Sequence, residues 1–367
     1  MEARLRWYDL IVIGAGPGGS SAAILAARKG ARVLLLERGA FPRHKVCGEF
    51  VSAESLDLLE TLLGRAAADL VTVALRIGRA RLFLDGHLVE NSITPSAASI
   101  ARFELDAALW NAAKSSGVAT QDRITVNAVR NDGAFRIMSS AGEFSAAAVI
   151  DASGRWSNLG SHAKPTGPRW LGIKGHFREN KPSQSVDLYF FEGGYCGVQP
   201  VDLLEDDHRT CRVNACAMVR ADRATELSQI FDLHPDLKDR SRQWQPLMDP
   251  VSTSPLIFRK PSPTRDGMFL VGDAAAFVDP FIGDGISLAL RSGALASECL
   301  ASSATVSLAL QAYSRRYEVE LGPIFRASST LRRILALPAV VRKPGLVLLN
   351  SSPRLKQYIV SRTRRVS

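Results

Sequence analysis

The amino-acid sequence predicts an α/β fold, in which a Rossmann-type dinucleotide-binding domain carries an inserted mixed β-sheet substrate domain and a C-terminal helical tail. Two observations support this fold class. Near the N-terminus a strand, a glycine turn, a helix and a second strand follow one another within about thirty residues, which is a βαβ unit. Strand-like apolar runs with proline-rich joints fill residues 165–265, between further segments typical of a nucleotide domain.

The expected domains are discontinuous along the chain. We assign residues 1–70, 97–160 and 265–305 to the nucleotide-binding domain, residues 71–96 and 161–264 to the substrate domain, and residues 306–367 to a basic, helical C-terminal region.

Apolar periodicity and the flanking turns predict the individual elements. In the nucleotide domain, strands are expected at 8–13, 32–37, 118–120, 124–129, 147–154 and 268–276, and helices at 14–30, 103–114 and 285–301. In the substrate domain, residues 185–191 and 209–219 alternate as strands do.

Charge is unevenly distributed along the chain. After Phe325 there are ten Lys or Arg and no Asp or Glu, which accounts for the whole net charge of +10. Such a tail either packs on the substrate domain as a helical cap or meets an anionic membrane surface or an acyl-carrier protein. Nucleic acid is disfavoured, because Tyr358 is the one aromatic residue of residues 326–367.

The sequence predicts a cytoplasmic protein, either free or peripheral at a membrane, because we find no targeting signal and no paired cysteine spacing in it. No run of 18 apolar residues is present, and the N-terminal apolar run is too short for a signal peptide. The five cysteines are odd in number and form no CxxC pair. We therefore expect no disulfide framework and no metal site.

The glycine turn Gly14-Ala15-Gly16-Pro17-Gly18-Gly19 lies between the first strand and the first helix. Gly14 allows the tight turn, Gly16 lets a pyrophosphate approach the backbone, and Gly19 lets helix and strand pack closely. The helix N-terminus supplies free N–H groups for the phosphates. Glu37, at the end of the second strand, is placed to hold the adenosine ribose. Pro17 and Arg38 complete this set of cofactor-binding candidates.

Later segments indicate FAD rather than NAD as the bound dinucleotide. Asp273 ends a strand and can hold a ribitol hydroxyl. The run from Asp279 to Ile286 opens the last helix of the nucleotide domain, and its residues Pro280, Gly283, Gly285 and Ile286 can present N–H groups to the flavin pyrimidine edge. No second GxGxxG exists, so NAD(P)H, if it is the electron donor, would bind transiently.

Four motifs in this order resemble the geranylgeranyl reductase family, within the superfamily of flavin aromatic hydroxylases and flavin-dependent halogenases. The motifs are GAGPGGSSAA, FPRHKVCGE at 41–49, DASGRWS at 151–157 and GDAAAFVDPFIGDGI at 272–286, and the resemblance covers residues 8–305. It implies that Arg102 faces the flavin or its phosphates, and that the main chain of Val126 contacts adenine.

The resemblance also implies three catalytic candidates, Lys45, Cys47 and Tyr195. The Cys47 loop is expected to pass the flavin ring, where a thiol can give a proton or shape the pocket; the alternative is an inert buried cysteine. Glu49 stands where the family usually has a second glycine. Tyr195 lies in GYCGVQP, which keeps the tyrosine of the family's aromatic motif without its tryptophan and phenylalanine.

Each branch of the superfamily differs from this sequence at one point. The histidine that hydroxylases usually have after Gly-Asp-Ala is Ala275 here, and the WxWxIP motif of halogenases is absent. The function expected first is an NAD(P)H-dependent monooxygenase acting on an apolar or aromatic small molecule. The alternatives are a carbon–carbon double-bond reductase of a prenyl or other lipid, a halogenase acting on a carrier-bound substrate, and a non-catalytic flavin electron carrier.

Overall fold

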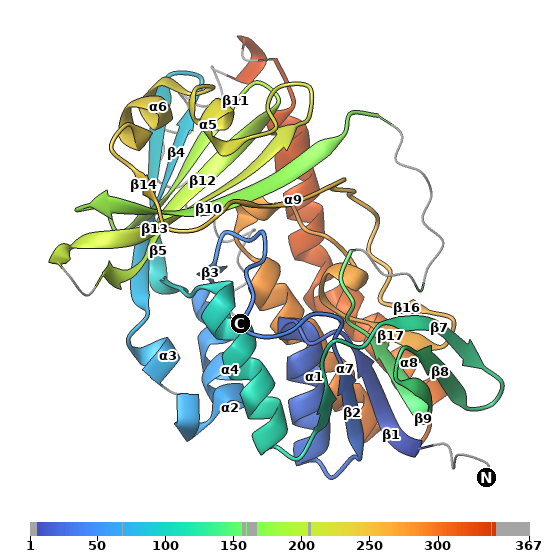
Figure 1. Ribbon diagram of the computed structural model, residues 1–367. Coiled ribbons are helices and arrows are strands. Elements are labelled where there is room, and N and C mark those ends of the chain that lie inside the picture. Colours follow the sequence, from blue (N-terminus) through green and yellow to red (C-terminus); the bar gives the residue numbers. More distant parts are fainter. Residues whose placement is uncertain are drawn as a thin grey trace.

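The structure is a computed structural model that describes residues 6–67, 69–155, 159, 167–204, 207–338 and 340–342. Figure 1 shows two β-sheets, one packed against helices and a second one beyond it. This arrangement confirms the α/β fold class that the sequence predicts. The tail residues 343–367 lie outside the described residues.

The first sheet is the core of the nucleotide domain. Its strands are β1 (Arg6–Ile13), β2 (Val33–Leu36), β6 (Ala119–Gln121), β7 (Val126–Asn131), β8 (Phe135–Ser139), β9 (Gly142–Asp151), β16 (Thr264–Arg265) and β17 (Met268–Leu270). The order is β16-β17-β9-β1-β2-β6, and the pairings from β17 to β6 are parallel. Because parallel strands are covered on both faces, β2 is entirely buried.

The strands β7 and β8 cover one face of this sheet, and helices cover the other. The helices are α1 (Pro17–Arg28), α2 (Leu56–Leu63), α3 (Asp69–Thr72), α4 (Arg102–Ser115), α7 (Gly285–Ser302) and α8 (Val306–Glu320). Small residues let α1 and α7 approach closely, since a Cβ on Gly293 would overlap the carbonyl oxygen of Gly18. The glycines around the turn therefore serve helix packing as well as the turn itself.

The second sheet lines one side of the cavity between the two sheets. Its strands are β3 (Phe50–Val51), β4 (Leu75–Leu84), β5 (His87–Ser99), β10 (Trp170–Asn180), β11 (Ser185–Phe191), β12 (Gly194–Leu204), β13 (Asp207–Arg220), β14 (Gln245–Pro246) and β15 (Val251–Thr253). The order is β14-β10-β13-β12-β11-β4-β5-β3. β4 and β11 pair in parallel, which joins the early hairpin β4–β5 to strands from much later in the chain.

Two short helices, α5 (Leu227–Phe231) and α6 (Pro235–Ser241), lie against one face of the second sheet (Figure 1). Leu227, Ile230 and Leu237 pack there into a cluster with side chains of β12 and β13. The opposite face of the second sheet packs toward the nucleotide domain.

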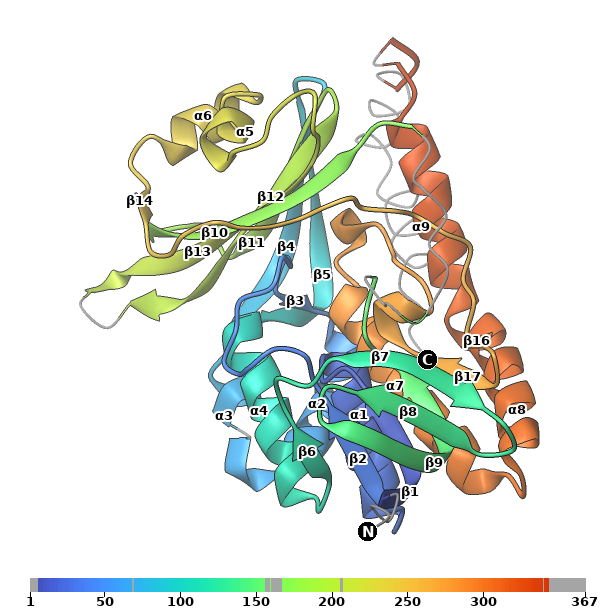
Figure 2. The ribbon, with the colours of Figure 1, turned by 45° about the vertical axis from the view of Figure 1, so that its right-hand side comes forward.

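The helices after residue 305 do not form one separate tail. α8 packs on α7, and Tyr313 and Tyr317 are buried in the core of the nucleotide domain. We assigned 306–367 to the C-terminal region, and its first fifteen residues belong structurally with α7. α9 (Gly322–Leu335) then runs from the nucleotide domain toward the outer end of the second sheet (Figure 2). Among the described residues, none of the helices is both long enough and apolar enough to cross a bilayer.

Candidate functional site

A cavity of about 620 Å³ is lined by residues of both sheets. Its volume falls within the range of roughly 300–1,000 Å³ typical of cofactor and small-molecule sites. The sequence candidates that line it are Gly14, Gly16, Pro17, Glu37, Arg38, Lys45, Cys47, Arg102, Val126, Tyr195, Asp273, Pro280, Gly283, Gly285 and Ile286. Gly19 lies beneath the turn, where a Cβ would overlap the carbonyl oxygen of Gly14. The fold thus brings the candidates together, while their individual roles stay predictions.

The glycine turn has the geometry that a dinucleotide needs. Gly14 has a φ of 102°, and a Cβ there would overlap the carbonyl oxygen of Ala152. At Gly16 the nearest atom to such a Cβ would be Nη2 of Arg102 at 3.9 Å, so the backbone faces the cavity. Pro17 is the first residue of α1, where its missing N–H costs nothing.

Glu37 is fixed at the carboxyl end of β2. Its Oε2 accepts a 2.8 Å hydrogen bond from Ala15 N, and its Oε1 accepts one of 2.8 Å from Gly39 N. Arg43 forms an ion pair with the same carboxylate. Burial alone would raise the pKa of Glu37, but the hydrogen bond and charge of Arg43 lower it below its ordinary value. The carboxylate stays ionised at neutral pH, as a hydrogen-bond acceptor for ribose hydroxyls should.

Cations outnumber carboxylates among the described residues that line the cavity. The cations are Arg38, Arg43, Lys45, Arg102 and Arg155, and the carboxylates are Glu37, Glu49 and Asp273. Burial is the main cause that lowers the pKa of Lys45 to about 8, and the positive charge of Arg43 is the second. The Lys45 side chain is nevertheless exposed to the cavity. A dinucleotide diphosphate complements this positive field.

Arg102 is held rigidly at the start of α4. Its Nε and Nη2 donate to the two carboxylate oxygens of Asp106, each at 2.7 Å. The guanidinium also contacts the Cys47 side chain. The Arg102 guanidinium thus lies between the glycine turn and the Cys47 loop, which is expected to pass the flavin.

The far end of the cavity contains Asp273 and the beginning of α7. Nε of Arg155 lies 3.5 Å from Oδ2 of Asp273. Burial raises the pKa of Asp273, and the charge of Arg155 opposes that rise. Gly283 has a φ of 77°, which turns the chain into α7 and leaves the first N–H groups of the helix toward the cavity. Charged groups, hydrogen-bonding groups and the start of α7 therefore line one cavity that extends from the glycine turn to Asp273 and Gly285.

The part of the cavity wall that the second sheet forms is mostly apolar and includes sulfur-containing side chains. Cys216 and Met218 on β13 line the cavity with Tyr195 on β12 and Cys47 on the loop before β3. Burial raises the pKa of Cys216 to about 12, so this group is a neutral thiol at physiological pH. All five cysteines are free, as the lack of paired spacings predicts.

Tyr195 has a buried carboxyl partner. Its hydroxyl donates to Oδ1 of Asp279 at 3.3 Å. Burial raises the pKa of Asp279 to about 6. Asp279 starts the one-turn helix at Pro280–Ile282 that precedes α7, so Tyr195 links the substrate sheet to the predicted flavin end of the cavity.

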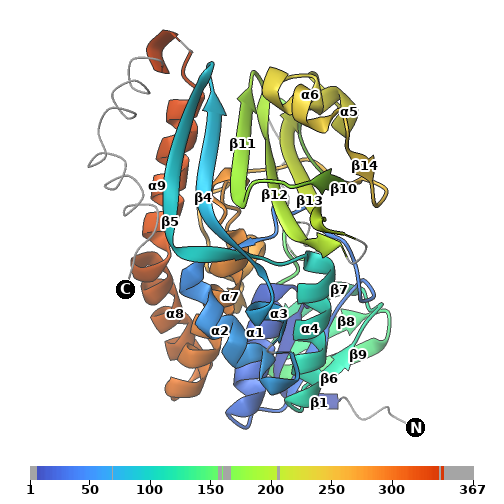
Figure 3. The ribbon, with the colours of Figure 1, turned by 90° about the vertical axis from the view of Figure 1, so that its left-hand side faces the viewer.

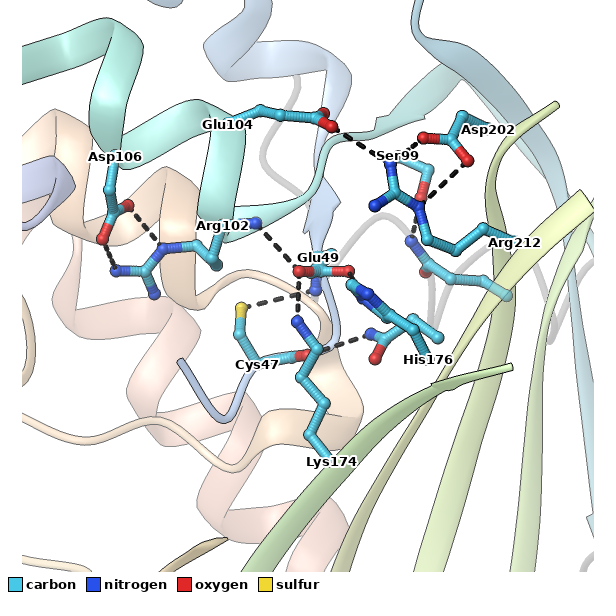
Figure 4. A network of polar contacts seen from close by, with 12 residues as sticks. Cys47, Glu49, Ser99, Arg102, Glu104, Asp106, Lys174, His176, Asp202 and Arg212 are labelled. Carbon is cyan, nitrogen blue, oxygen red and sulfur yellow. Dashed lines mark hydrogen bonds and ion pairs between the residues drawn. The ribbon is translucent and has the colours of Figure 1, made fainter. Parts of the chain in front are cut away.

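A buried network behind Cys47 was missed by sequence reasoning (Figure 4). Glu49 is fully buried and pairs with Lys174, also fully buried, on β10. Its Oε2 accepts from His176 Nε2 at 2.8 Å, whereas Arg102 N donates at 2.8 Å to Oε1, the oxygen that also meets Lys174. Burial alone would raise the pKa of Glu49, but His176 and Lys174 lower it.

One sequence signal could have indicated this network. Glu49 occupies a position where the family usually has glycine, and its φ is 62°. A non-glycine residue in that conformation needs compensating contacts. The contacts come from Lys174 and His176, more than a hundred residues further along the chain.

The fold and the site together define a flavin-dependent oxidoreductase. A family model described as FAD binding domain matches residues 8–318, and the chain belongs to this family. It is therefore an FAD-dependent enzyme whose precise reaction the family does not determine.

Curated relatives span several activities. Menaquinone reductase of Mycobacterium tuberculosis is 28% identical over 94% of this chain and 88% of that protein. Digeranylgeranylglycerophospholipid reductase 2 of Methanopyrus kandleri is 28% identical over 90% and 87%. Tryptophan 2-halogenase of Chondromyces crocatus is 25% identical over 84% and 65%.

Solved structures share the fold. A flavin-dependent brominase has a TM-score of 0.80 at 20% identity, covering 97% of this chain and 93% of that one. A geranylgeranyl bacteriochlorophyll reductase-like protein of Thermoplasma acidophilum has a TM-score of 0.74 at 20% identity, covering 97% and 96%. These matches confirm the fold and the resemblance that the motifs indicate.

Proposed function

We propose that this enzyme adds two hydrogen atoms across a carbon–carbon double bond of a lipophilic, isoprenoid-type substrate. The observation that carries the proposal is the pair of free thiols, Cys47 and Cys216, on the cavity wall. A thiol can give a proton to a carbon centre, whereas free thiols beside a site of oxygen activation are open to oxidation. The thiols thus favour reduction over the hydroxylation that the sequence suggested first.

In the proposed reaction one carbon of the double bond receives a hydride and its neighbour receives a proton. When bound, FAD would supply hydride chemistry here, with NAD(P)H as the external two-electron donor. Cys47 gives the proton: its S–H bond breaks, a C–H bond forms, and the thiolate is left beside the Arg102 guanidinium. That positive charge stabilises the thiolate until water returns a proton.

The remaining side chains orient the substrate and exclude water. Tyr195, Met218, Leu256 and Phe277 line the cavity and belong to one apolar cluster that continues to other aromatic rings. Such a wall suits an extended hydrocarbon better than a small polar ring. Two relatives, a menaquinone reductase and a digeranylgeranylglycerophospholipid reductase, support a substrate of this kind.

The test offers two probe lipids, menaquinone and a geranylgeranyl glycerophospholipid, to protein whose flavin has been reduced chemically. Under strictly anaerobic conditions we expect a product that has gained two hydrogen atoms in its isoprenoid chain, located by fragmentation in mass spectrometry, whereas a gain confined to the quinone ring would mean quinone reduction only. A product that forms only with oxygen and contains one atom of labelled oxygen would instead identify a hydroxylase. A halogenated product with added bromide would identify a halogenase. No turnover of either probe, with reversible flavin reduction, would favour an electron carrier.

A further inference from the structure

Exposed apolar side chains are concentrated at the end of α9 and in the short turn that follows it. Ile334, Leu337, Val340 and Val341 are 48%, 43%, 82% and 59% exposed. Single exposed apolar residues are ordinary on a protein surface, but four within eight residues form a local patch. We call these four residues the α9 patch.

Basic residues surround the α9 patch. From Gly322 to Arg342 the sequence has four arginines and no Asp or Glu. Arg333 is exposed beside Ile334. Arg342 donates to both carboxylate oxygens of Asp85, at 3.0 and 2.8 Å, in the turn between β4 and β5. This ion pair fixes the turn after α9 to the outer end of the second sheet, and Figure 3 shows α9 and the β4–β5 hairpin reaching the same end of the molecule.

Aromatic rings connect the base of this surface to the cavity. The Arg332 guanidinium lies 3.9 Å above the ring of Phe258. Phe258 stacks on Phe277 with ring centroids 5.2 Å apart, and Phe277 lines the cavity. Both rings are only partly buried, within the apolar cluster that includes Tyr195 and Met218. Two stacked aromatic rings therefore lie between Arg332 of α9 and the predicted substrate side of the cavity.

We propose that the α9 patch docks this enzyme on the surface of an anionic lipid bilayer. Aliphatic side chains enter the boundary between head groups and acyl chains, and the arginines meet the anionic head groups. A second copy of the chain fits poorly, because a two-fold interface would bring together two α9 segments that each carry four arginines and no Asp or Glu. An acidic carrier protein would match the arginines, but the wide exposure of Val340 and Val341 suits insertion into lipid.

Docking on the bilayer and passage of a lipid into the cavity depend on different residues. Binding to the bilayer rests on the α9 patch alone. Passage of a lipid along Phe258 and Phe277 into the cavity rests in addition on the proposed function. A protein that binds vesicles but reduces no lipid would therefore contradict the proposed reaction and leave the docking surface intact.

The experiment measures flotation of the full-length, FAD-loaded protein with vesicles. Neutral phosphatidylcholine vesicles are compared with vesicles that contain about one third phosphatidylglycerol, at low and high salt. We expect binding to the anionic vesicles, weakened by salt. Arg333→Glu should weaken it by at least about fivefold, because each basic residue near such a surface contributes on that order. Val340→Glu should weaken it at least as much.

Two matched variants serve as controls. Val73→Glu places the same charge on another exposed valine, 76% exposed, beside α3. Arg242→Glu reverses an arginine whose side chain is 69% exposed, at the end of α6. Both should bind vesicles like the wild type, and all variants should keep normal FAD content and thermal unfolding.

Several outcomes would overturn the proposal. One is equal binding to neutral and anionic vesicles, and another is an equal loss in Val73→Glu and Val340→Glu. A concentration-dependent dimer in sedimentation velocity that Val340→Glu dissociates would identify a self-association surface. Binding of purified acyl-carrier protein that Val340→Glu abolishes, without vesicle binding, would identify a carrier contact.

Discussion

Glu49→Gln tests whether the buried network behind Cys47 holds the cavity together. Glu49 and Lys174 are both fully buried, and His176 is 2% exposed. Glutamine keeps the size of the side chain and can still accept from Arg102 N. It removes the negative charge that compensates Lys174, and its –NH₂ group donates only, so either Lys174 or His176 loses its acceptor.

The expected cost follows from leaving a buried charge unpaired. Breaking a buried ion pair by changing one partner destabilises a protein by about 3–5 kcal/mol. We expect losses of this size in the free energy of unfolding for Glu49→Gln and for Lys174→Met. The double variant should lose less than the sum of the two, with a coupling of at least about 1 kcal/mol. Glu90→Gln, in the exposed pair with Arg79 at 3.4 Å, should change stability by less than about 1 kcal/mol.

The assay is urea unfolding at a fixed FAD concentration, followed by circular dichroism. The pH dependence gives a second readout, because the folded protein lowers the pKa of Glu49. Its contribution to stability is complete above the unfolded pKa of about 4.3 and is lost as pH falls through the lower folded value. Glu49→Gln should lack this acid-range component. A Glu49→Gln variant within about 1 kcal/mol of wild type, with an unchanged acid limb, would refute the reasoning.

Four further outcomes concern the cofactor and the reaction. Gly16→Val should fold but not retain FAD, because its side chain takes pyrophosphate space; normal FAD absorbance in the purified variant would contradict the site. Asp273→Ala should weaken FAD binding by about 1–3 kcal/mol, measured by fluorescence titration, and an unchanged Kd would remove its ribitol role. Cys47→Ala should retain FAD and lose at least about tenfold in turnover, about 1.4 kcal/mol in the barrier, so normal turnover would make Cys47 a packing residue. Because the pKa of Lys45 is about 8, FAD binding to wild type should weaken as pH rises above about 8, where Lys45 of the FAD-free protein loses its charge. Lys45→Arg, which stays charged, should not show this change, and an identical profile would contradict the assignment.

Local backbone requirements explain why the cofactor end could be predicted from the sequence. A tight turn between a strand and a helix demands glycine where φ is positive, as at Gly14, and where helix and strand pack closely, as at Gly19. Glu37 follows the second short apolar strand of the same βαβ unit, at the edge of the sheet where the glycine turn lies. These constraints act within some twenty residues, so the pattern is visible along the chain. The order of the later motifs then indicated FAD and the family.

The substrate side of the site depended on contacts that no local pattern encodes. Glu49 meets Lys174 and His176 because β10 enters the second sheet beside the loop before β3, although 125 and 127 residues separate them along the chain. Tyr195 similarly meets Asp279 across 84 residues. Strand alternation predicts which faces are buried, but it does not predict which strands are neighbours, such as the parallel pair β4 and β11. A buried charge is stable only beside its partner, so tertiary packing decided where Glu49 and Lys174 could lie.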